Sequence, residues 1–165
     1  MYKKAVQLKP EYALAYYNLG VSYDNLRKPS DAMEAYKKAI HFKPDFPSAY
    51  LNLGANYEVL GKKQDAVETY KKAILLHPDF VDAYYNLGHV YSDTGKKEEA
   101  IEAYKKSIQI GPKESIAYRN LGLLYEELGK KEAAIDIWKK GFQVASRPED
   151  REKLVKFLKD YGVSP

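Results

Sequence analysis

The chain has 165 residues, of which 45% are hydrophobic and 30% are charged, with a formal net charge of +4. This length suits one domain, and this composition is typical of a folded protein rather than a disordered one. No apolar run approaches the roughly 18–20 residues that a membrane-spanning helix needs. The absence of cysteine excludes disulfides, thiol catalysis and cysteine-bound metals.

The sequence repeats itself every 34 residues, as four Asn-Leu-Gly tripeptides show most clearly. Their glycines are Gly20, Gly54, Gly88 and Gly122. Tyrosines keep a fixed place before and after each glycine, followed by an alanine and then by an aromatic residue, Tyr36 in the first unit. The period therefore accounts for most of the 16 tyrosines, which are expected to be packing residues. A period of this length predicts a solenoid of helical repeats.

In chain order, residues 1–12 have the pattern of a second helix whose partner helix is missing, so we expect the chain to begin inside a longer array. Apolar residues at helical spacing predict helices over 13–26 and 30–42, and this pair then recurs. The expected repeats are 13–46, 47–80, 81–114 and 115–148, followed by a capping helix over 149–165. A single array is therefore expected to span 1–165, with a polar cap at its C-terminal end.

The turns between paired helices contain Gly61, Gly95 and Gly129, and glycine suits a left-handed residue just past a helix end. The first unit has Arg27 at this place, so its turn is expected to differ. The small residues at Gly20 and at its counterparts predict a close approach of the two helices of each pair.

These columns resemble the tetratricopeptide repeat (TPR) family, whose pattern is Trp-x₂-Leu-Gly-x₂-Tyr, then Ala-x₃-Phe, then Pro. Tyr16 and its counterparts stand where the family has Trp, and the resemblance covers essentially the whole chain. It implies an all-α fold, a right-handed TPR superhelical solenoid of antiparallel helix pairs. In such a solenoid the first helices line the concave side. The array is also similar to the TPR superhelix of O-linked N-acetylglucosamine transferases and to consensus-like TPR proteins.

No catalytic or cofactor motif is visible in the sequence. The three histidines occupy different places in the repeat and lack metal-ligand spacing. We therefore expect no enzyme activity, no metal and no cofactor. Lysine pairs recur on the second helices and in the turns, which favours a solvated outer surface over the continuous basic track of a nucleic-acid site.

Three columns of the first helices are candidates for contact with a peptide in the concave groove. The asparagine column either fixes neighbouring repeats by hydrogen bonds or forms an amide ladder that holds an extended peptide. The columns before and after it vary between units, as a surface for an asymmetric ligand would, although Tyr17 and Tyr85 could merely shield neighbouring helices. The candidate peptide-binding residues are Tyr17, Asn18, Val21, Leu51, Asn52, Ala55, Tyr85, Asn86, His89, Arg119 and Asn120.

The predicted function is a non-catalytic protein-interaction scaffold. The alternatives are a targeting segment of a larger enzyme, such as a glycosyltransferase, and a module that assembles through the solenoid ends. Acidic residues at the expected groove rim favour an apolar or basic ligand over an acidic one. They are Asp24, Glu58, Asp82, Asp93, Glu126 and Glu127. Of the five places that form a two-carboxylate clamp for chaperone tails in the family, only Asn52 matches. We expect no nucleic-acid or membrane partner, weak self-association through the N-terminal end, and a cytoplasmic location.

Overall fold

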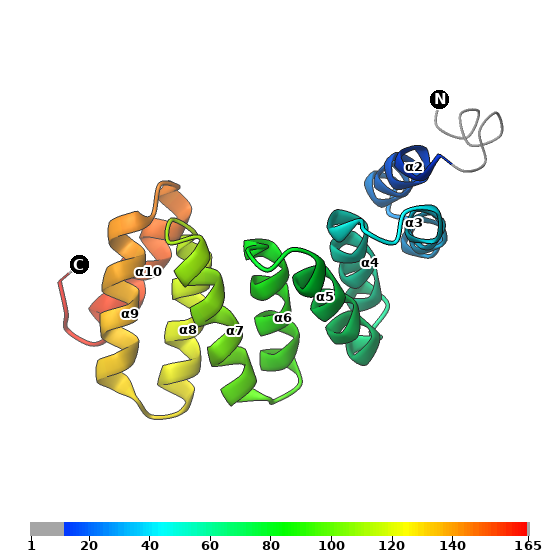
Figure 1. Cartoon of the computed structure of the whole chain (residues 1–165). Helices are drawn as coiled ribbons and strands as arrows, with labels where there is room; N and C mark the ends of the chain where they lie inside the picture. The colour runs from blue at the N-terminus through cyan, green and yellow to red at the C-terminus, as the bar shows by residue number, and fades with distance from the viewer. Residues whose placement is uncertain (1–11, 165) are drawn as a thin grey trace. The chain divides into compact units, whose positions relative to one another are not determined.

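The computed structural model describes residues 12–164, and in that range it contains nine α-helices and no strand. The helices are α2 (Ala13–Asn25), α3 (Pro29–Phe42), α4 (Pro47–Val59), α5 (Lys63–Leu76), α6 (Val81–Asp93), α7 (Lys97–Ile110), α8 (Ser115–Glu127), α9 (Lys131–Val144) and α10 (Pro148–Asp160) (Figure 1). The predicted all-α fold of helix pairs is confirmed. The sequence predicted a second helix without its partner over residues 1–12, and residues 1–11 of this segment lie outside the described residues. The expected N-terminal self-association surface lies outside them as well.

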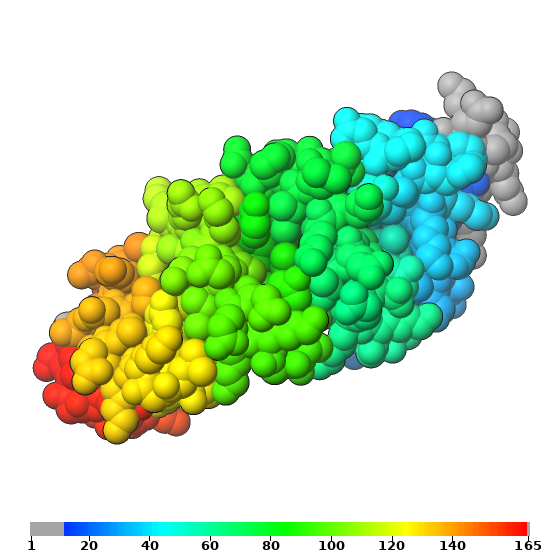
Figure 2. Space-filling model, turned by 60° about the horizontal axis from the view of Figure 1, so that its bottom comes forward, coloured from blue at the N-terminus to red at the C-terminus, as the bar shows by residue number. Residues whose placement is uncertain are grey.

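The chain divides into two compact units, Met1–Val90 and Tyr91–Pro165, with the boundary inside α6. In the first unit, α2 pairs with α3, α4 pairs with α5, and α3 packs against α4. In the second, α8 pairs with α9 and also contacts α7, while α10 packs against α9 and α8. The cyan-to-green surface of the first unit follows chain order in the space-filling view (Figure 2). Each unit is therefore built from consecutive helix hairpins.

The turns within the hairpins share one backbone geometry. Gly61 has φ +72° and donates its N–H to the Glu58 carbonyl, while the next N–H reaches the Tyr57 carbonyl. This is the Schellman motif, which satisfies the last carbonyls of a helix. The first hairpin has the same pair of hydrogen bonds, with Arg27 at φ 53°. The expectation that its turn would differ is therefore wrong, because the motif forces the arginine into the left-handed conformation.

The core of the α2–α3 and α4–α5 hairpins is an aromatic ring packed on a glycine. Tyr36 and Tyr70 are fully buried, and a Cβ atom added at Gly20 or Gly54 would stand 2.5 Å from the nearest carbon of the facing ring. The predicted close approach is confirmed at these glycines. The ring of the second helix, rather than its backbone, occupies the space that the missing side chain leaves.

Helix α10 closes the second unit. Leu154 and Leu158 are fully buried, and Phe157 stacks on Trp138 with ring centroids 5.0 Å apart. The opposite side of α10 is charged, with Glu152, Lys156 and other exposed residues. This arrangement is that of a cap, since it buries the apolar face of the last hairpin and presents a polar face to solvent.

Candidate functional site

Two asparagines of the first helices, Asn52 and Asn120, reach back to buried tyrosines of the preceding repeat. The Asn52 amide donates to the hydroxyls of Tyr36 and Tyr17, at 3.3 Å in each case, and the Asn120 amide donates to the Tyr104 hydroxyl at 3.5 Å. These bonds are long, yet each joins two neighbouring repeats. The geometry supports the interpretation that the asparagines fix adjacent repeats. The peptide-ladder interpretation stays a prediction.

The hydroxyls of two buried tyrosines, Tyr36 and Tyr70, donate to carboxylates at the ends of the first helices. Tyr36 donates to Asp24 Oδ2 at 2.5 Å, and Tyr70 donates to Glu58. Burial, reinforced by the adjacent carboxylate, raises the pKa of Tyr36 and of Tyr70 well above the ordinary value. Two acids that were expected to form a charged groove rim are thus engaged in tying the hairpins together.

The last repeat replaces this tyrosine by Trp138, and the cap supplies the missing hydroxyl. Tyr161, which lies beside Trp138 with centroids 5.9 Å apart, donates to Glu126 Oε1 at 2.5 Å. This hydrogen bond, with a contribution from desolvation, raises the pKa of Tyr161. A carboxylate–hydroxyl contact is therefore present at the C-terminal end of the array as well, although the residue that provides the hydroxyl comes from a different element.

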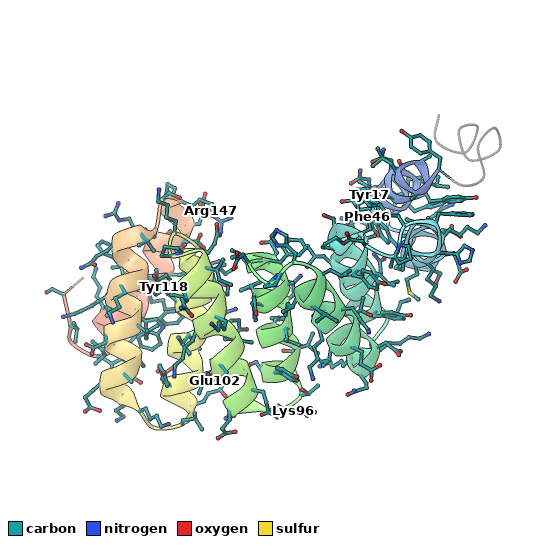
Figure 3. All side chains as sticks on the ribbon, viewed as in Figure 1. Tyr17, Phe46, Lys96, Glu102, Tyr118 and Arg147 are labelled. Carbon is teal, nitrogen blue, oxygen red and sulfur yellow. The ribbon has the colours of Figure 1, made fainter. Side chains whose placement is uncertain are left out.

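Two candidate binding residues take part in packing. Tyr17 lies against Phe46, with ring centroids 4.8 Å apart, at the junction of the first two repeats (Figure 3). This supports the alternative in which Tyr17 shields neighbouring helices. Arg119 pairs with the buried carboxylate of Asp150 in the cap at 3.6 Å, and its side chain is only 18% exposed. Arg147 also pairs with Asp150, at 2.7 Å.

Four other candidates of the first unit form one row of side chains, in which Val21 packs against the hydrophobic cluster around Tyr36 and His89 contacts Glu58. This row, called here the first-helix face, consists of Val21 on α2, Leu51 and Ala55 on α4, and His89 on α6. The first three are half-buried and His89 is exposed. His89 Nδ1 lies 3.1 Å from Glu58 Oε2, so one carboxylate borders this face. Asn18, Tyr85 and Asn86 are also half-buried first-helix residues of this unit, whereas Arg119 and Asn120 belong to the second unit.

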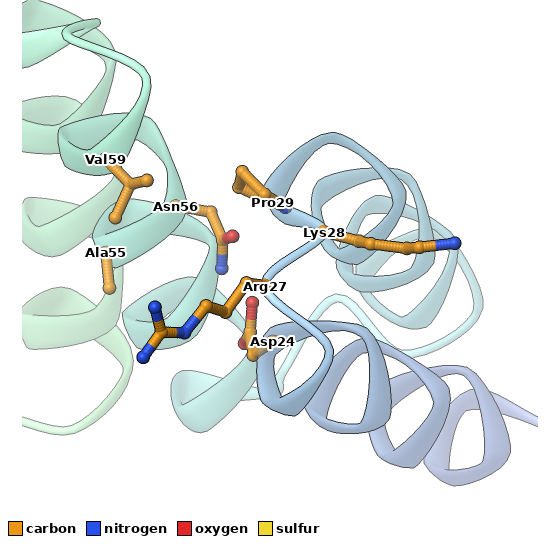
Figure 4. A pocket seen from close by; sticks show the side chains of 7 residues that line it. All are labelled: Asp24, Arg27, Lys28, Pro29, Ala55, Asn56 and Val59. Carbon is orange, nitrogen blue, oxygen red and sulfur yellow. The ribbon is translucent and has the colours of Figure 1, made fainter.

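A pocket of about 460 Å³ was not anticipated from the sequence. It lies between the α2–α3 turn and the last two turns of α4, and seven side chains line it (Figure 4). They are Asp24, Arg27, Lys28, Pro29, Ala55, Asn56 and Val59. The signal that could have revealed it is an arginine in a column where the later repeats have glycine.

The side chains from residue 12 to residue 164 include no group of three or more histidines and acids placed to hold a metal ion. Over the same stretch, every helix is too short or too polar to cross a membrane.

Comparison with known proteins gives a consistent result. The family model described as tetratricopeptide repeat matches residues 13–46 and 81–114, a TPR repeat model matches 59–95, and a further tetratricopeptide repeat model matches 103–136. A search of curated proteins found no match.

Among solved structures, a crystal structure of MamA is 35% identical, with 94% of this chain and 87% of that chain covered and a TM-score of 0.83. A second crystal structure of MamA protein is 32% identical, with coverages of 99% and 84% and a TM-score of 0.79. MamA 41-end from Desulfovibrio magneticus RS-1 has a TM-score of 0.75 at 20% identity, covers 90% and 92%, and shows likeness of fold alone.

Proposed function

Because the chain belongs to the tetratricopeptide repeat family, we propose that it binds a peptide or helix of a partner protein on its first-helix face, without catalysis. The repeats and the likeness to MamA support the broader role of a protein-interaction scaffold. Helical repeat proteins use extended surfaces for such contacts, because each repeat adds a similar helix beside the last. The binding surface and the ligand chemistry are the parts that this proposal adds.

The observation that carries the proposal is the contrast between adjacent columns of the first helices. Asn52, Asn120 and Tyr17 make contacts that hold repeats together. Val21, Ala55 and His89 occupy equivalent places in successive repeats, differ in chemistry, and are not fully buried. The adjacent columns of the first helices fix the helix spacing, whereas the residues of this face vary from repeat to repeat. Such a face suits recognition of a ligand that has no internal repeat.

The chemistry of this face favours an apolar or basic ligand. Val21, Leu51 and Ala55 offer aliphatic surface, and the Glu58 carboxylate stands at its border beside His89. A lysine or arginine of the ligand would compete with His89 for Glu58, whereas an acidic ligand would meet a like charge. The ligand we propose is thus a segment in which an aliphatic side chain accompanies a cation.

A panel of soluble 12-residue peptides, varied in charge and hydropathy, tests the proposal by fluorescence anisotropy. The double variant Leu51→Lys with His89→Lys should weaken the binding of basic apolar peptides at least about tenfold, since it adds two cations to the face. The matched control, Gln64→Lys with Leu75→Lys, adds the same charge to exposed places on α5 and should bind as the unaltered chain does.

Circular dichroism before each titration would establish that both variants keep the helical fold. A preference for acidic peptides that survives the Leu51 and His89 changes would refute the proposed ligand chemistry. Equal loss of binding in the test and control variants would refute the location.

A further inference from the structure

The pocket at the α2–α3 turn differs from the corresponding places in the later repeats. Its two sides come from successive hairpins of the first unit, since Arg27 belongs to the first turn and Val59 to the end of α4. The equivalent turns contain Gly61, Gly95 and Gly129, which present no side chain. The internal repeats therefore serve as a control for what the fold itself requires at this place.

Arg27 adopts the left-handed conformation, with φ 53°, although a side chain there is less favourable than glycine. Its exposed guanidinium has no hydrogen bond or ion pair with any residue of the described range. Within the described residues, no hydrogen bond or ion pair of the Arg27 side chain thus offsets the strain of its backbone. Strain that is held at one position of a repeat, and is absent from the equivalent positions, is a pattern found at binding sites.

A second departure from the repeat pattern faces the first across the pocket. Val59 is 73% exposed, and its counterparts in the other units are polar, namely Asn25, Asp93 and Glu127. An exposed valine at the end of a helix adds nothing to the core. Arg27 and Val59 nevertheless line the same cavity, together with Ala55 and Pro29.

These neighbours define the ligand chemistry. Arg27 extends past Asp24 toward Ala55, while Lys28 points away from the cavity (Figure 4). Asp24 Oδ2 accepts a hydrogen bond from the Tyr36 hydroxyl at 2.5 Å and stays an anion, so the pocket lining places one guanidinium, that of Arg27, beside one carboxylate. A guanidinium presents paired donors that match a carboxylate. The wall beyond it is aliphatic, and about 460 Å³ is within the usual range of small binding pockets.

We propose that this turn pocket is a second peptide-binding site, which adjoins the first-helix face at Ala55, for a segment with an aliphatic side chain next to a carboxylate. The carboxylate pairs with Arg27, and the aliphatic side chain packs on Ala55 and Val59. This ligand is opposite in charge to the one proposed for the first-helix face. The two sites would let one scaffold hold two chemically different segments.

The test is a titration of the ¹⁵N-labelled chain with acetyl-Gly-Leu-Glu-Gly-amide, followed by amide chemical shifts. Matched peptides with glutamine or lysine in place of glutamate are the ligand controls. The glutamate peptide should shift the amides of residues 24–28 and 56–59 in a saturable way and bind more tightly than the glutamine peptide, and the lysine peptide should bind least. Added salt should reduce this preference, because the guanidinium is exposed to solvent.

Two variants take their new residues from other repeats, so the fold is expected to tolerate them. Arg27→Gly should weaken the glutamate peptide about fivefold and leave the glutamine peptide unchanged, whereas Val59→Asn should weaken both. Lys62→Gln removes one positive charge from the next turn and should change neither. The Leu51 and His89 double variant should also bind the glutamate peptide normally, so that the two sites can be assessed separately.

Equal shifts with all three peptides, an absence of shifts in residues 24–28 and 56–59, or unchanged affinity after Arg27→Gly would each overturn the proposal.

Discussion

The contact between Gly54 and the Tyr70 ring predicts the outcome of a single added methyl group. In the Gly54→Ala variant the new Cβ would stand 2.5 Å from Tyr70 Cε1, although carbon atoms pack best at about 3.5–4.0 Å. The ring is fully buried and its hydroxyl is held by Glu58 and Asn86, so it has little room to retreat. Overpacking costs about 1–3 kcal/mol, and alanine regains about 0.5–1 kcal/mol of helix propensity. The expected net loss of stability is therefore between about 0 and 2.5 kcal/mol.

Urea unfolding followed by circular dichroism would measure this loss, and a double-mutant cycle would assign it to the ring. In a Tyr70→Leu background the clash is gone, so Gly54→Ala should become neutral or stabilise the chain by up to about 1 kcal/mol. Gly61→Ala is the control, because no atom lies within 4 Å of its Cβ and its cost of about 1 kcal/mol comes from φ +72°. A Gly54→Ala effect that is stabilising, or identical in both backgrounds, would refute the packing argument.

Four further predictions follow from the same contacts. Arg27→Gly should raise the free energy of unfolding by about 0.5–1 kcal/mol, because the strain relieved in the left-handed conformation exceeds the entropy that glycine adds to the unfolded chain. A lower melting temperature would contradict this. Ser107→Ala should raise the free energy of unfolding, measured in urea, by about 1 kcal/mol, since the buried Ser107 hydroxyl has no hydrogen-bond partner. Asp150→Asn should cost about 1–3 kcal/mol and speed amide exchange in α10, because two arginines lose their charged partner; unchanged exchange would count against the role of this ion pair. Finally, the raised pKa values of Tyr36 and Tyr70 keep both side chains neutral in the folded chain. Their contribution to the free energy of unfolding is therefore complete below about pH 10, where the unfolded tyrosines are also neutral. Above that pH it falls by about 1.4 kcal/mol per pH unit for each tyrosine. Absorbance at 295 nm should show these two ionising only as the helices melt, and ionisation of every tyrosine in an intact fold would exclude this.

The period of 34 residues was enough to predict the helices and the core. Helix spacing of apolar residues predicted the pairs, and the glycines at Gly61 and its counterparts predicted the turns, because backbone conformations of this kind have few alternatives. The resemblance to the TPR family named the architecture, which the family models and the MamA structures support. The prediction succeeded because similar residues fill equivalent places in the packing of each repeat.

The functional surface was harder to predict, because a polar residue at a groove position can serve the fold instead. The sequence left open whether the asparagines hold repeats or a ligand, and the hydrogen bonds of Asn52 and Asn120 to tyrosine hydroxyls favour the first interpretation. Arg119 looked available until the cap placed Asp150 beside it. The sequence pattern gives the spacing of residues along one helix. The contacts of Asn52 with Tyr36 and of Arg119 with Asp150 depend instead on which helix lies opposite.

The turn at Arg27 illustrates the reverse error. A departure from the glycine column suggested a different backbone, yet the hydrogen bonds of the motif impose the same conformation on arginine. The departure changed the surface rather than the fold. In a repeat protein, side chains that break the pattern without changing the backbone are therefore good places to look for binding sites.

The claim that the first-helix face binds peptides has one direct test. The ¹⁵N-labelled chain would be titrated with the tightest basic apolar peptide of the panel, and amide shifts would be mapped onto the helices. The account predicts saturable shifts around Val21, Leu51, Ala55 and His89, with α3 and α5 largely unaffected. Saturable shifts confined to α3 and α5, the second helices of the same hairpins, would contradict it.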